Sequence, residues 1–440
     1  MKSYDLAIIG AGWAGFNAAL RADGLGLKVV LIEEEEIGGT CLNRGCIPTK
    51  FLVHSAKLFS QAKKANQFGI AISQSQINLA EAKQKKDILV KTLRDNLLNL
   101  LRSRKAIDFI KARAKLISRN EISLGDEKIT SKFILIASGS RPKELGDLKF
   151  DSEKVLSSTE ILNLENLPKN ILIIGGGVIG CEFASLFSNL ETEVLIVEFM
   201  DRLLPQEDVE ISRKIETIFK KRKINVMTKT DARNLDWKSF DKVLLCIGRD
   251  PYTSEMGLQD IGIKLEKTRI VTDEYMRTDI ENIYAAGDCT SPKQLAHLAT
   301  HQAILAVENM VNSNNPHTFN INVIPSCIFT DPEIASIGLD ESSARKQNLK
   351  IIIDRFDFLG SGMARIINET EGFIKIVSDK DTEKILGAAM IGPRVTELIA
   401  IFSVAIKQGL TRRELAEVIF AHPTLSEGIG EALHKGLYGF

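Results

Sequence analysis

The hydrophobic pattern of this chain contains one succession of elements twice. A short apolar run at residues 6–9 leads into a glycine-rich turn, a helical pattern over residues 16–25 and a second apolar run at residues 28–32. Residues 171–198 repeat that succession, again with a helical pattern between two apolar runs. Short apolar runs without polar alternation are typical of parallel strands that helices cover on both faces. The pattern therefore predicts two doubly wound, Rossmann-like α/β units.

Each unit closes in the same way, and the first contains a long insertion. We expect an apolar strand that ends in glycine at residues 134–139 and again at residues 243–248. Before the first of these strands lie a helical pattern, roughly residues 79–104, and short alternating strands over residues 107–129. This insertion should add a layer to the first sheet.

The pattern changes after about residue 320. Residues 350–353 and 372–377 are typical of antiparallel strands, and helical patterns cover roughly residues 396–407 and 411–419. The chain is therefore expected to be an α/β protein with two doubly wound dinucleotide-binding domains and a C-terminal α+β domain. The expected domains are residues 1–147 with 270–319, residues 148–269, and residues 320–440.

Composition and charge exclude several functional classes. The 440 residues include 57 Lys and Arg against 57 Asp and Glu, so the formal net charge is zero and does not favour a nucleic-acid partner. We find neither a signal-peptide pattern nor an apolar run long enough to span a bilayer. Six cysteines without a secretory context indicate a reducing compartment. We therefore expect a cytoplasmic protein that binds neither nucleic acid nor membrane.

Both glycine-rich turns have the spacing G-x-G-x-x-G. In each unit an acid, Glu33 or Glu198, ends the second strand 23 positions after the first glycine. Such glycines let a pyrophosphate approach the start of a helix, and the acid can accept hydrogen bonds from ribose hydroxyls. One such turn would be weak evidence, but strand, turn, helix and acid occur together twice. The glycines are Gly10, Gly12 and Gly15 in the first unit and Gly175, Gly177 and Gly180 in the second.

Cys41 and Cys46 lie five positions apart, just before a helical pattern that runs on from Phe51. Pro48 suits the first turn of a helix, so Cys46 should lie at or just before its start, where free N–H groups favour a thiolate. Two structural thiols or half of a metal site are the alternatives. Because no second cysteine pair or Cys/His cluster has zinc spacing, we expect no metal. The pair is best interpreted as a redox-active disulfide. The other cysteines are expected to be ordinary buried thiols: Cys181, Cys246, Cys289 and Cys327.

Three polar residues complete the candidates. Asp288 follows an apolar strand and Gly287, where its carboxylate could hold a ribityl hydroxyl or simply be solvated. His422 could supply the base that a thiol–disulfide exchange needs near neutral pH, or be a satisfied turn residue. Glu427 could orient His422, or close a capping box with Thr424.

These motifs occur in the order found in the flavoprotein disulfide reductases, which the chain resembles from end to end. The resemblance rests on Cys41-x4-Cys46, both glycine motifs, Ala286-Gly287-Asp288 and the segment from His422 to Glu427. Three stretches, residues 288–297, 324–336 and 421–427, are most similar to the members that oxidise dihydrolipoamide, and glutathione reductases tend to differ at all three. The resemblance implies oxidation of protein-bound dihydrolipoamide to lipoamide, with NAD+ reduced to NADH.

The resemblance also implies cofactors and roles. FAD would bind the first unit and the nicotinamide cofactor the second. Because Glu198 would repel a 2′-phosphate and Phe199 is not basic, NAD is expected rather than NADP. The catalytic residues would be Cys41, Cys46, His422 and Glu427. The residues at FAD would be Gly10, Gly12, Gly15, Glu33, Thr40, Lys50, Gly139 and Asp288, and those at NAD would be Gly175, Gly177, Gly180, Glu182, Glu198 and Gly248.

A homodimer is implied as well, because in this family the C-terminal domain brings its histidine to the cysteines of the other subunit. Lys50 and Glu182 match positions that form an ion pair near the flavin and the nicotinamide. The expected partner is a lipoylated carrier domain or protein of a 2-oxo acid dehydrogenase or glycine-cleavage complex.

Two alternatives and one departure accompany this interpretation. A related reductase, acting on glutathione or mercuric ion, is disfavoured by Glu198 and by the lack of extra C-terminal cysteines. A non-catalytic flavoprotein subunit would not need the complete set of Cys, His and Glu. Between Asp231 and Asp241 the chain lacks a hairpin that is usual in the family, and residues 234–239 are expected to form a short direct connection.

Overall fold

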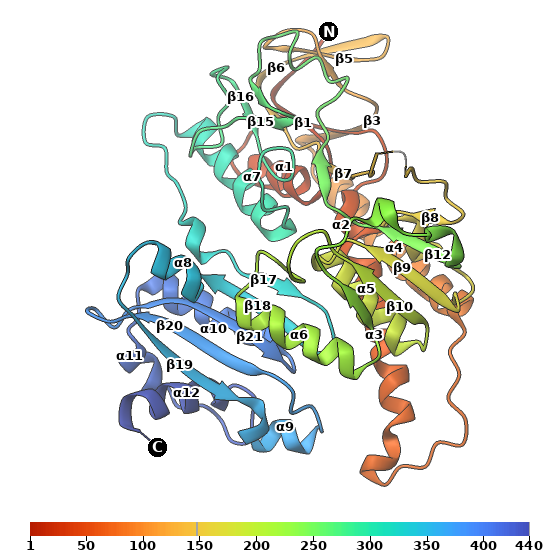
Figure 1. Ribbon diagram of the computed structural model, residues 1–440. Helices are drawn as coiled ribbons and strands as arrows, with labels where there is room; N and C mark the ends of the chain where they lie inside the picture. The colour runs from red at the N-terminus through yellow and green to blue at the C-terminus, as the bar shows by residue number, and fades with distance from the viewer. Residues whose placement is uncertain (147, 440) are drawn as a thin grey trace.

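The computed structural model describes residues 1–146 and 148–439. In this described part, three larger sheets with their helices and two two-stranded ribbons form the fold (Figure 1). The expected domain ends at residues 147 and 440 lie outside the described residues, and the other expected boundaries stay predictions. Within the described part, no helix has the length and apolar character needed to cross a membrane.

The first sheet has seven strands in the order β3-β2-β1-β6-β5-β4, with β16 paired to the end of β6. Leu6 of β1 lies between Val29 and Phe133 of its parallel neighbours. Every residue of β2 is buried, which explains its unbroken apolar run. Helices α1 (Trp13–Gly24) and α7 (Ala296–Val311) pack against this sheet in one apolar cluster. The strands are β1 (Lys2–Ile9), β2 (Val29–Glu33), β3 (Ile107–Lys111), β4 (Lys115–Leu116), β5 (Glu121–Leu124), β6 (Glu127–Ile136) and β16 (Ile283–Ala285).

A helical insertion after β2 carries the two candidate redox cysteines. It comprises α2 (Gly39–Arg44), α3 (Cys46–Lys63), η1 (Ala65–Phe68) and α4 (Leu79–Arg102). The helix predicted over residues 79–104 is confirmed, and the Asn78 side chain caps it by accepting the Glu81 N–H. The glycine-rich segment before Cys46 is itself helical, so the short α2 meets the start of the longer α3 at the cysteine pair.

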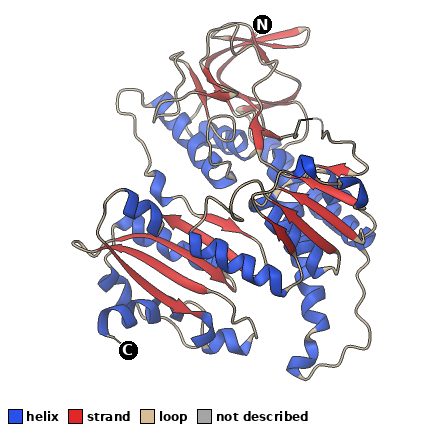
Figure 2. Cartoon of the chain, viewed as in Figure 1, coloured by secondary structure: helices blue, strands red, loops and turns tan. Residues whose placement is uncertain are grey.

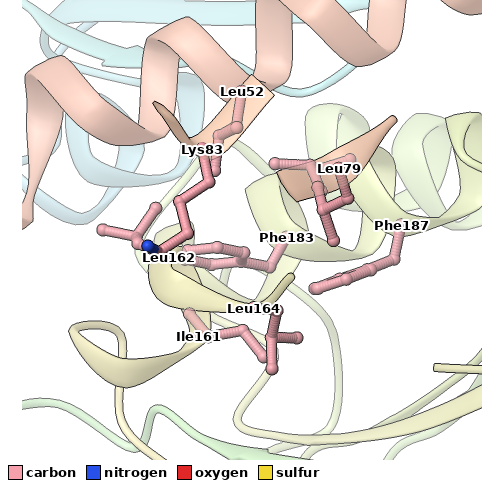
Figure 3. A pocket seen from close by; sticks show the side chains of 9 residues that line it. Leu52, Leu79, Lys83, Ile161, Leu162, Leu164, Phe183 and Phe187 are labelled. Carbon is pink, nitrogen blue, oxygen red and sulfur yellow. The ribbon is translucent and has the colours of Figure 1, made fainter. Parts of the chain in front are cut away.

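The insertion packs against the second unit. A pocket between α3, α4 and α5 (Val178–Asn189) is lined almost entirely by apolar side chains (Figure 3). Leu52 of α3, Leu79 of α4 and Phe183 of α5 contribute to its wall, and Lys83 is the charged member of the lining. This composition indicates a packing contact between two domains rather than a nucleotide site.

The second sheet is parallel throughout, in the order β11-β10-β9-β12-β8. The expected short connection is confirmed, because η3 (Ala232–Asn234) and η4 (Trp237–Ser239) run directly from β11 to β12. Leu235, Trp237 and Phe240 pack on the sheet's apolar face, so the connection still covers the core. The remaining elements are β8 (Val155–Leu156), η2 (Glu160–Asn163), β9 (Asn170–Ile174), β10 (Glu193–Val197), α6 (Val209–Lys221), β11 (Asn225–Met227) and β12 (Lys242–Leu245).

A two-stranded antiparallel ribbon joins the two units. β7 (Ser140–Pro142) begins directly after Gly139, and β13 (Arg249–Pro251) begins directly after Gly248. The two glycines predicted at the ends of the closing strands therefore lie at the junction between the domains. A second ribbon pairs β14 (Leu265–Glu266) with β15 (Arg269–Ile270).

The third sheet is antiparallel, in the order β17-β18-β21-β20-β19, as Figure 2 shows with its flanking helices. The helix predicted over residues 396–407 is confirmed as α10, whereas the one predicted over 411–419 is shorter. Thr411 caps that short helix in a capping box with Glu414. The elements are η5 (Ile321–Val323), β17 (Ser326–Ile328), β18 (Glu333–Gly338), α8 (Glu341–Lys346), β19 (Ile351–Asp357), η6 (Phe358–Gly360), α9 (Gly362–Ile366), β20 (Phe373–Asp379), β21 (Ile385–Gly392), α10 (Val395–Gln408), α11 (Arg412–Ala416) and α12 (Glu427–Tyr438).

One buried cluster of charges fixes the second unit to the third. Lys375 of β20, whose side chain is 2% exposed, lies 2.7 Å from Asp208, 2.9 Å from Glu210 and 3.3 Å from Glu341. Asp208 caps α6 of the second unit, and Glu341 begins α8 of the third. A buried ammonium is strongly destabilising unless carboxylates surround it, so this cluster requires the two domains to stay together.

Candidate active site

The glycine turn of the first unit lies between β1 and α1. A Cβ on Gly15 would lie 1.8 Å from the carbonyl oxygen of Gly10, so only glycine fits there. No side chain caps α1 and its first turn has no acid, which leaves N–H groups available for a pyrophosphate. Glu33 accepts the N–H groups of Ala11 at 2.6 Å and Glu35 at 2.9 Å, and burial raises its pKa. The fold thus orients this carboxylate beside the start of α1.

The second unit repeats that geometry. A Cβ on Gly180 would lie 1.9 Å from the carbonyl oxygen of Gly175, and α5 likewise has no side-chain cap. Glu198 accepts the N–H groups of Gly176 at 2.6 Å and Met200 at 2.7 Å. The residues in both turns fit a dinucleotide, because each leaves a helix N-terminus free and places an acid beside it.

The two cysteines have different acidities. Cys46 is the first residue of α3, and both Cys46 and Cys41 are free thiols in the structure. The hydrogen bond from Cys41 and the ammonium of Lys50 lower the pKa of Cys46 to about 7. The hydrogen bond with Cys46 and burial raise the pKa of Cys41. Cys46 is therefore the cysteine of the pair that ionises first, and the Cys41 thiol keeps its proton. Of the other cysteines, Cys181, Cys246 and Cys289 are buried as expected, whereas Cys327 is only half-buried.

Lys50 connects the cysteine helix to the other two domains. Its ammonium donates to both carboxylate oxygens of Glu182, at 2.9 and 2.8 Å. Glu182 on α5 also accepts the N–H of Phe329 at 2.9 Å, and the Phe329 ring lies 4.7 Å from the Lys50 ammonium. The contacts of this ion pair therefore join the three domains: Lys50 belongs to the first, Glu182 to the second and Phe329 to the third. Phe329 was not identified from the sequence.

Asp288 lies at the ribbon between the two units. It accepts the Ser140 hydroxyl at 2.7 Å, and the Arg249 guanidinium donates to the same hydroxyl at 2.8 Å. Arg249 also donates to the carbonyl oxygen of Ser140 at 2.6 Å and to the Thr40 hydroxyl at 3.5 Å. The expected carboxylate and the expected Thr40 are thereby brought together. Arg249 was missed, although it directly follows the predicted Gly248.

His422 and Glu427 form a pair on the third domain. The Nδ1 atom of His422 lies 2.7 Å from a Glu427 oxygen, and the second oxygen accepts the Thr424 N–H at 2.7 Å. These two hydrogen bonds lower the pKa of Glu427. The capping box considered for Thr424 does not form, because α12 begins only at Glu427 and Ser426 is its N-cap residue.

The pair is not assembled with the cysteines within one chain. The His422 side chain is 80% exposed, and α12 and α2 belong to different domains (Figure 1). Among the described residues, no group of three or more His, Cys, Asp and Glu side chains is placed to hold a metal ion.

Comparison with known proteins decides the family. Residues 4–303 match the model of the pyridine nucleotide-disulphide oxidoreductases, and residues 324–433 match the dimerisation domain of the same group. The chain belongs to the pyridine nucleotide-disulphide oxidoreductase family. This family of flavin-dependent enzymes uses FAD and NAD, in agreement with the two glycine turns described above.

Several members of the family match over nearly the whole chain. A dihydrolipoyl dehydrogenase of Bacillus subtilis is 38% identical, covering 98% of this chain and 97% of its own length. One from Chlamydia pneumoniae is 40% identical, covering 97% and 95%. Among solved structures, LpdA of Mycobacterium tuberculosis superposes with a TM-score of 0.91 at 25% identity and covers 99% of each chain. The flavoprotein disulfide reductase RclA of Escherichia coli gives 0.87 at 28% identity, covering 98% of this chain and 99% of its own.

Proposed function

We propose that this chain is a dihydrolipoyl dehydrogenase, which oxidises a protein-bound dihydrolipoamide to lipoamide and transfers the electrons to NAD+ through FAD. The observation that carries the proposal is the pair of Cys41 on α2 and Cys46 at the start of α3, next to the ion pair of Lys50 and Glu182. The match over nearly the whole chain to relatives named dihydrolipoyl dehydrogenase, at 38 and 40% identity, supports the choice of substrate.

The dithiol reaction starts with a base. The carboxylate of Glu427 accepts the Nδ1–H of His422, which leaves Nε2 free to take a proton from a substrate thiol. The substrate thiolate attacks the Cys41 sulfur of the disulfide, and Cys46 leaves as a thiolate. The second substrate thiol loses its proton to solvent, and its sulfur attacks the substrate sulfur of the mixed disulfide, which releases lipoamide and leaves Cys41 as a thiolate. Two thiols of the substrate are oxidised and two cysteines are reduced.

FAD, when bound, supplies the chemistry that converts this dithiol oxidation into hydride transfer to NAD+. The start of α1 with Glu33, Thr40, Gly139 and Asp288 holds FAD. The start of α5 with Glu198 and Gly248 holds NAD. Lys50 and Glu182 lie between the two units. The Lys50 ammonium stabilises the Cys46 thiolate, whereas the Glu182 carboxylate opposes it.

Two subunits complete the site. Within one chain His422 and the cysteines lie in different domains, and the third domain matches a dimerisation domain. Near His422, Ile419 is 95% exposed, and on α10 Val404 is 60% exposed, which suits a face that a second copy covers. We infer a homodimer in which His422 of the partner subunit acts on Cys41.

The inferred partner is a lipoylated carrier domain or protein of a 2-oxo acid dehydrogenase or glycine-cleavage complex, because the substrate dithiol is carried on such a protein. We also infer a cytoplasmic location, since free thiols such as Cys181 and Cys246 persist in a reducing compartment.

Anaerobic turnover of FAD-loaded protein with dihydrolipoamide tests the proposal, with NAD+ and NADP+ compared as acceptors. We expect rapid NADH formation and a poor rate with NADP+. The variant Cys46→Ser should keep FAD but lose turnover. Absence of dithiol oxidation by flavin-loaded, NADH-active protein would overturn the choice of substrate.

A further inference from the structure

Trp13 occupies an unexpected place in the first glycine turn. It is the first residue of α1 and follows Gly12 directly. The turn packs against the segment that begins α2, because the Gly38 N–H donates to the Ala11 carbonyl at 2.8 Å. A Cβ on Gly39 would lie 2.8 Å from the Gly12 Cα. This glycine-on-glycine contact brings the start of α1 next to the first turn of α2.

The contact places Trp13 at the redox pair. Cys41 lies two residues after Gly39, so the start of α1 lies beside it, and a hydrogen bond from the Trp13 side chain acts to lower the pKa of Cys41. An indole N–H is a donor only, so Trp13 can stabilise a thiolate but cannot take a proton. The other groups that act on Cys41 are Cys46, whose sulfur accepts the Cys41 S–H, and the Lys50 ammonium.

We propose that Trp13 is a further catalytic residue, whose indole N–H stabilises the Cys41 thiolate when lipoamide is released. The proposal rests on the proposed function. In that step the second thiolate of the substrate attacks the other substrate sulfur, which is bonded to Cys41 in the mixed disulfide. The bond between that sulfur and Cys41 breaks, the substrate closes its disulfide, and the electron pair stays on Cys41. Because a thiol of lower pKa leaves faster, a donor aimed at Cys41 accelerates product release.

Cysteine alkylation as a function of pH tests this role without requiring turnover. In FAD-loaded Cys46→Ser protein the Cys46 hydrogen bond is gone, so the environment of Cys41 can be measured alone. Adding Trp13→Phe keeps an aromatic ring but removes the N–H. We expect the midpoint of iodoacetamide alkylation at Cys41 to rise by about one pH unit. Coincident pH profiles with and without the indole would overturn the proposal.

The chain offers a matched control in its second tryptophan. Trp237 lies in η4 against the other nucleotide unit, so Trp237→Phe should leave the alkylation midpoint unchanged. It also leaves Trp13 as the sole tryptophan. In Cys46→Ser/Trp237→Phe protein, Trp13 fluorescence should then titrate with the same midpoint as Cys41 alkylation, and an emission that does not change with pH would contradict the contact. This measurement keeps Trp13 in place, so it tests the contact even if the Trp13 variants fail to fold.

The effect on catalysis is measured in rapid-mixing experiments. With Trp13→Phe in an otherwise natural chain, dihydrolipoamide oxidation should slow about tenfold, whereas electron transfer from NADH to a dye should be unchanged. An unchanged dithiol rate would remove Trp13 from catalysis. If the parent chain itself does not oxidise dihydrolipoamide, the proposed function fails, while the alkylation profiles still decide whether Trp13 acts on Cys41.

Discussion

The two glycine turns make corresponding backbone contacts but differ in what surrounds them. In both, the third glycine packs on the carbonyl oxygen of the first, which would lie only 1.8 or 1.9 Å from a Cβ at that position. Each acid accepts two backbone N–H groups, one at 2.6 Å from the residue after the first glycine. The backbone arrangement that suits a dinucleotide is therefore the same in both units.

The difference begins directly after each acid. In the first unit three further glutamates follow Glu33, and each forms an ion pair: Glu34 with Arg141 at 3.3 Å, Glu35 with Arg44, and Glu36 with Lys111 at 2.9 Å. In the second unit Phe199 and Met200 follow Glu198 and are 73% and 49% exposed. In the first unit, charged side chains from other segments pair with these glutamates, whereas in the second unit exposed apolar side chains take their place. Such a difference suits one nucleotide that is retained and one that exchanges at every turnover.

Adding one methyl group to either turn should give the largest effect. Gly15→Ala should prevent FAD loading and destabilise the first unit, because its Cβ has no space beside the Gly10 carbonyl. Gly180→Ala should keep FAD and dithiol-to-dye electron transfer, but lower NAD+ reduction by about 100-fold through displacement of the nucleotide. Flavin absorbance after purification and the two steady-state rates measure this. Loss of FAD from Gly180→Ala would show that the two sites are not independent.

Neutralising Glu198 or Glu33 should have a moderate effect on cofactor binding. Glu198→Gln weakens the hydrogen bonds from the ribose hydroxyls, so KM for NAD+ should rise about tenfold. The variant also removes the charge that repels a 2′-phosphate, so discrimination against NADP+ should fall. Glu33→Gln is the matched control, since it should weaken FAD binding and leave KM for NAD+ unchanged. Steady-state kinetics and flavin-fluorescence titrations separate the two. Unaltered cofactor preference in Glu198→Gln would contradict the assignment of NAD to the second unit.

Neutralising the two members of the ion pair between the units should give the smallest effect. The pH midpoint of Cys46 alkylation should shift in opposite directions for Lys50 and Glu182. Alkylation of Cys46 in reduced enzyme should be half-maximal near pH 7, with the thiolate above that pH. Lys50→Met removes a cation that favours the thiolate, so the midpoint should rise. Glu182→Gln removes an anion that disfavours it, so the midpoint should fall, each by less than about one pH unit. Shifts of the same sign would mean that Lys50 and Glu182 act through packing rather than charge.

Local motifs made much of this molecule predictable. The glycine turns, their acids and the helix that starts at Cys46 depend on residues close together in the chain, where spacing and backbone constraints decide the structure. The short α2 escaped prediction, because the glycines at 38, 39 and 45 disfavour a helix that tertiary packing nevertheless stabilises.

The missed residues share a different property, since each acts through a partner far away in sequence. Phe329 meets a carboxylate 147 positions earlier, and Lys375 meets one 165 positions earlier. Trp13 reaches Cys41 only because Gly12 and Gly39 touch. No local pattern reports such contacts. Arg249 is the exception that the sequence could have revealed, since it stands beside a predicted glycine at the junction of the domains.

The Lys375 cluster has a consequence for motion during the reaction cycle. To swing away from the third domain, α6 would have to expose an ammonium and the Asp208 carboxylate that are both almost fully buried. Large hinge opening is therefore disfavoured, and solution scattering should give the same radius of gyration with and without NADH. The relative positions of the second and third domains are then fixed when the chain folds, so the dithiol and the nucleotide must reach sites whose spacing does not change.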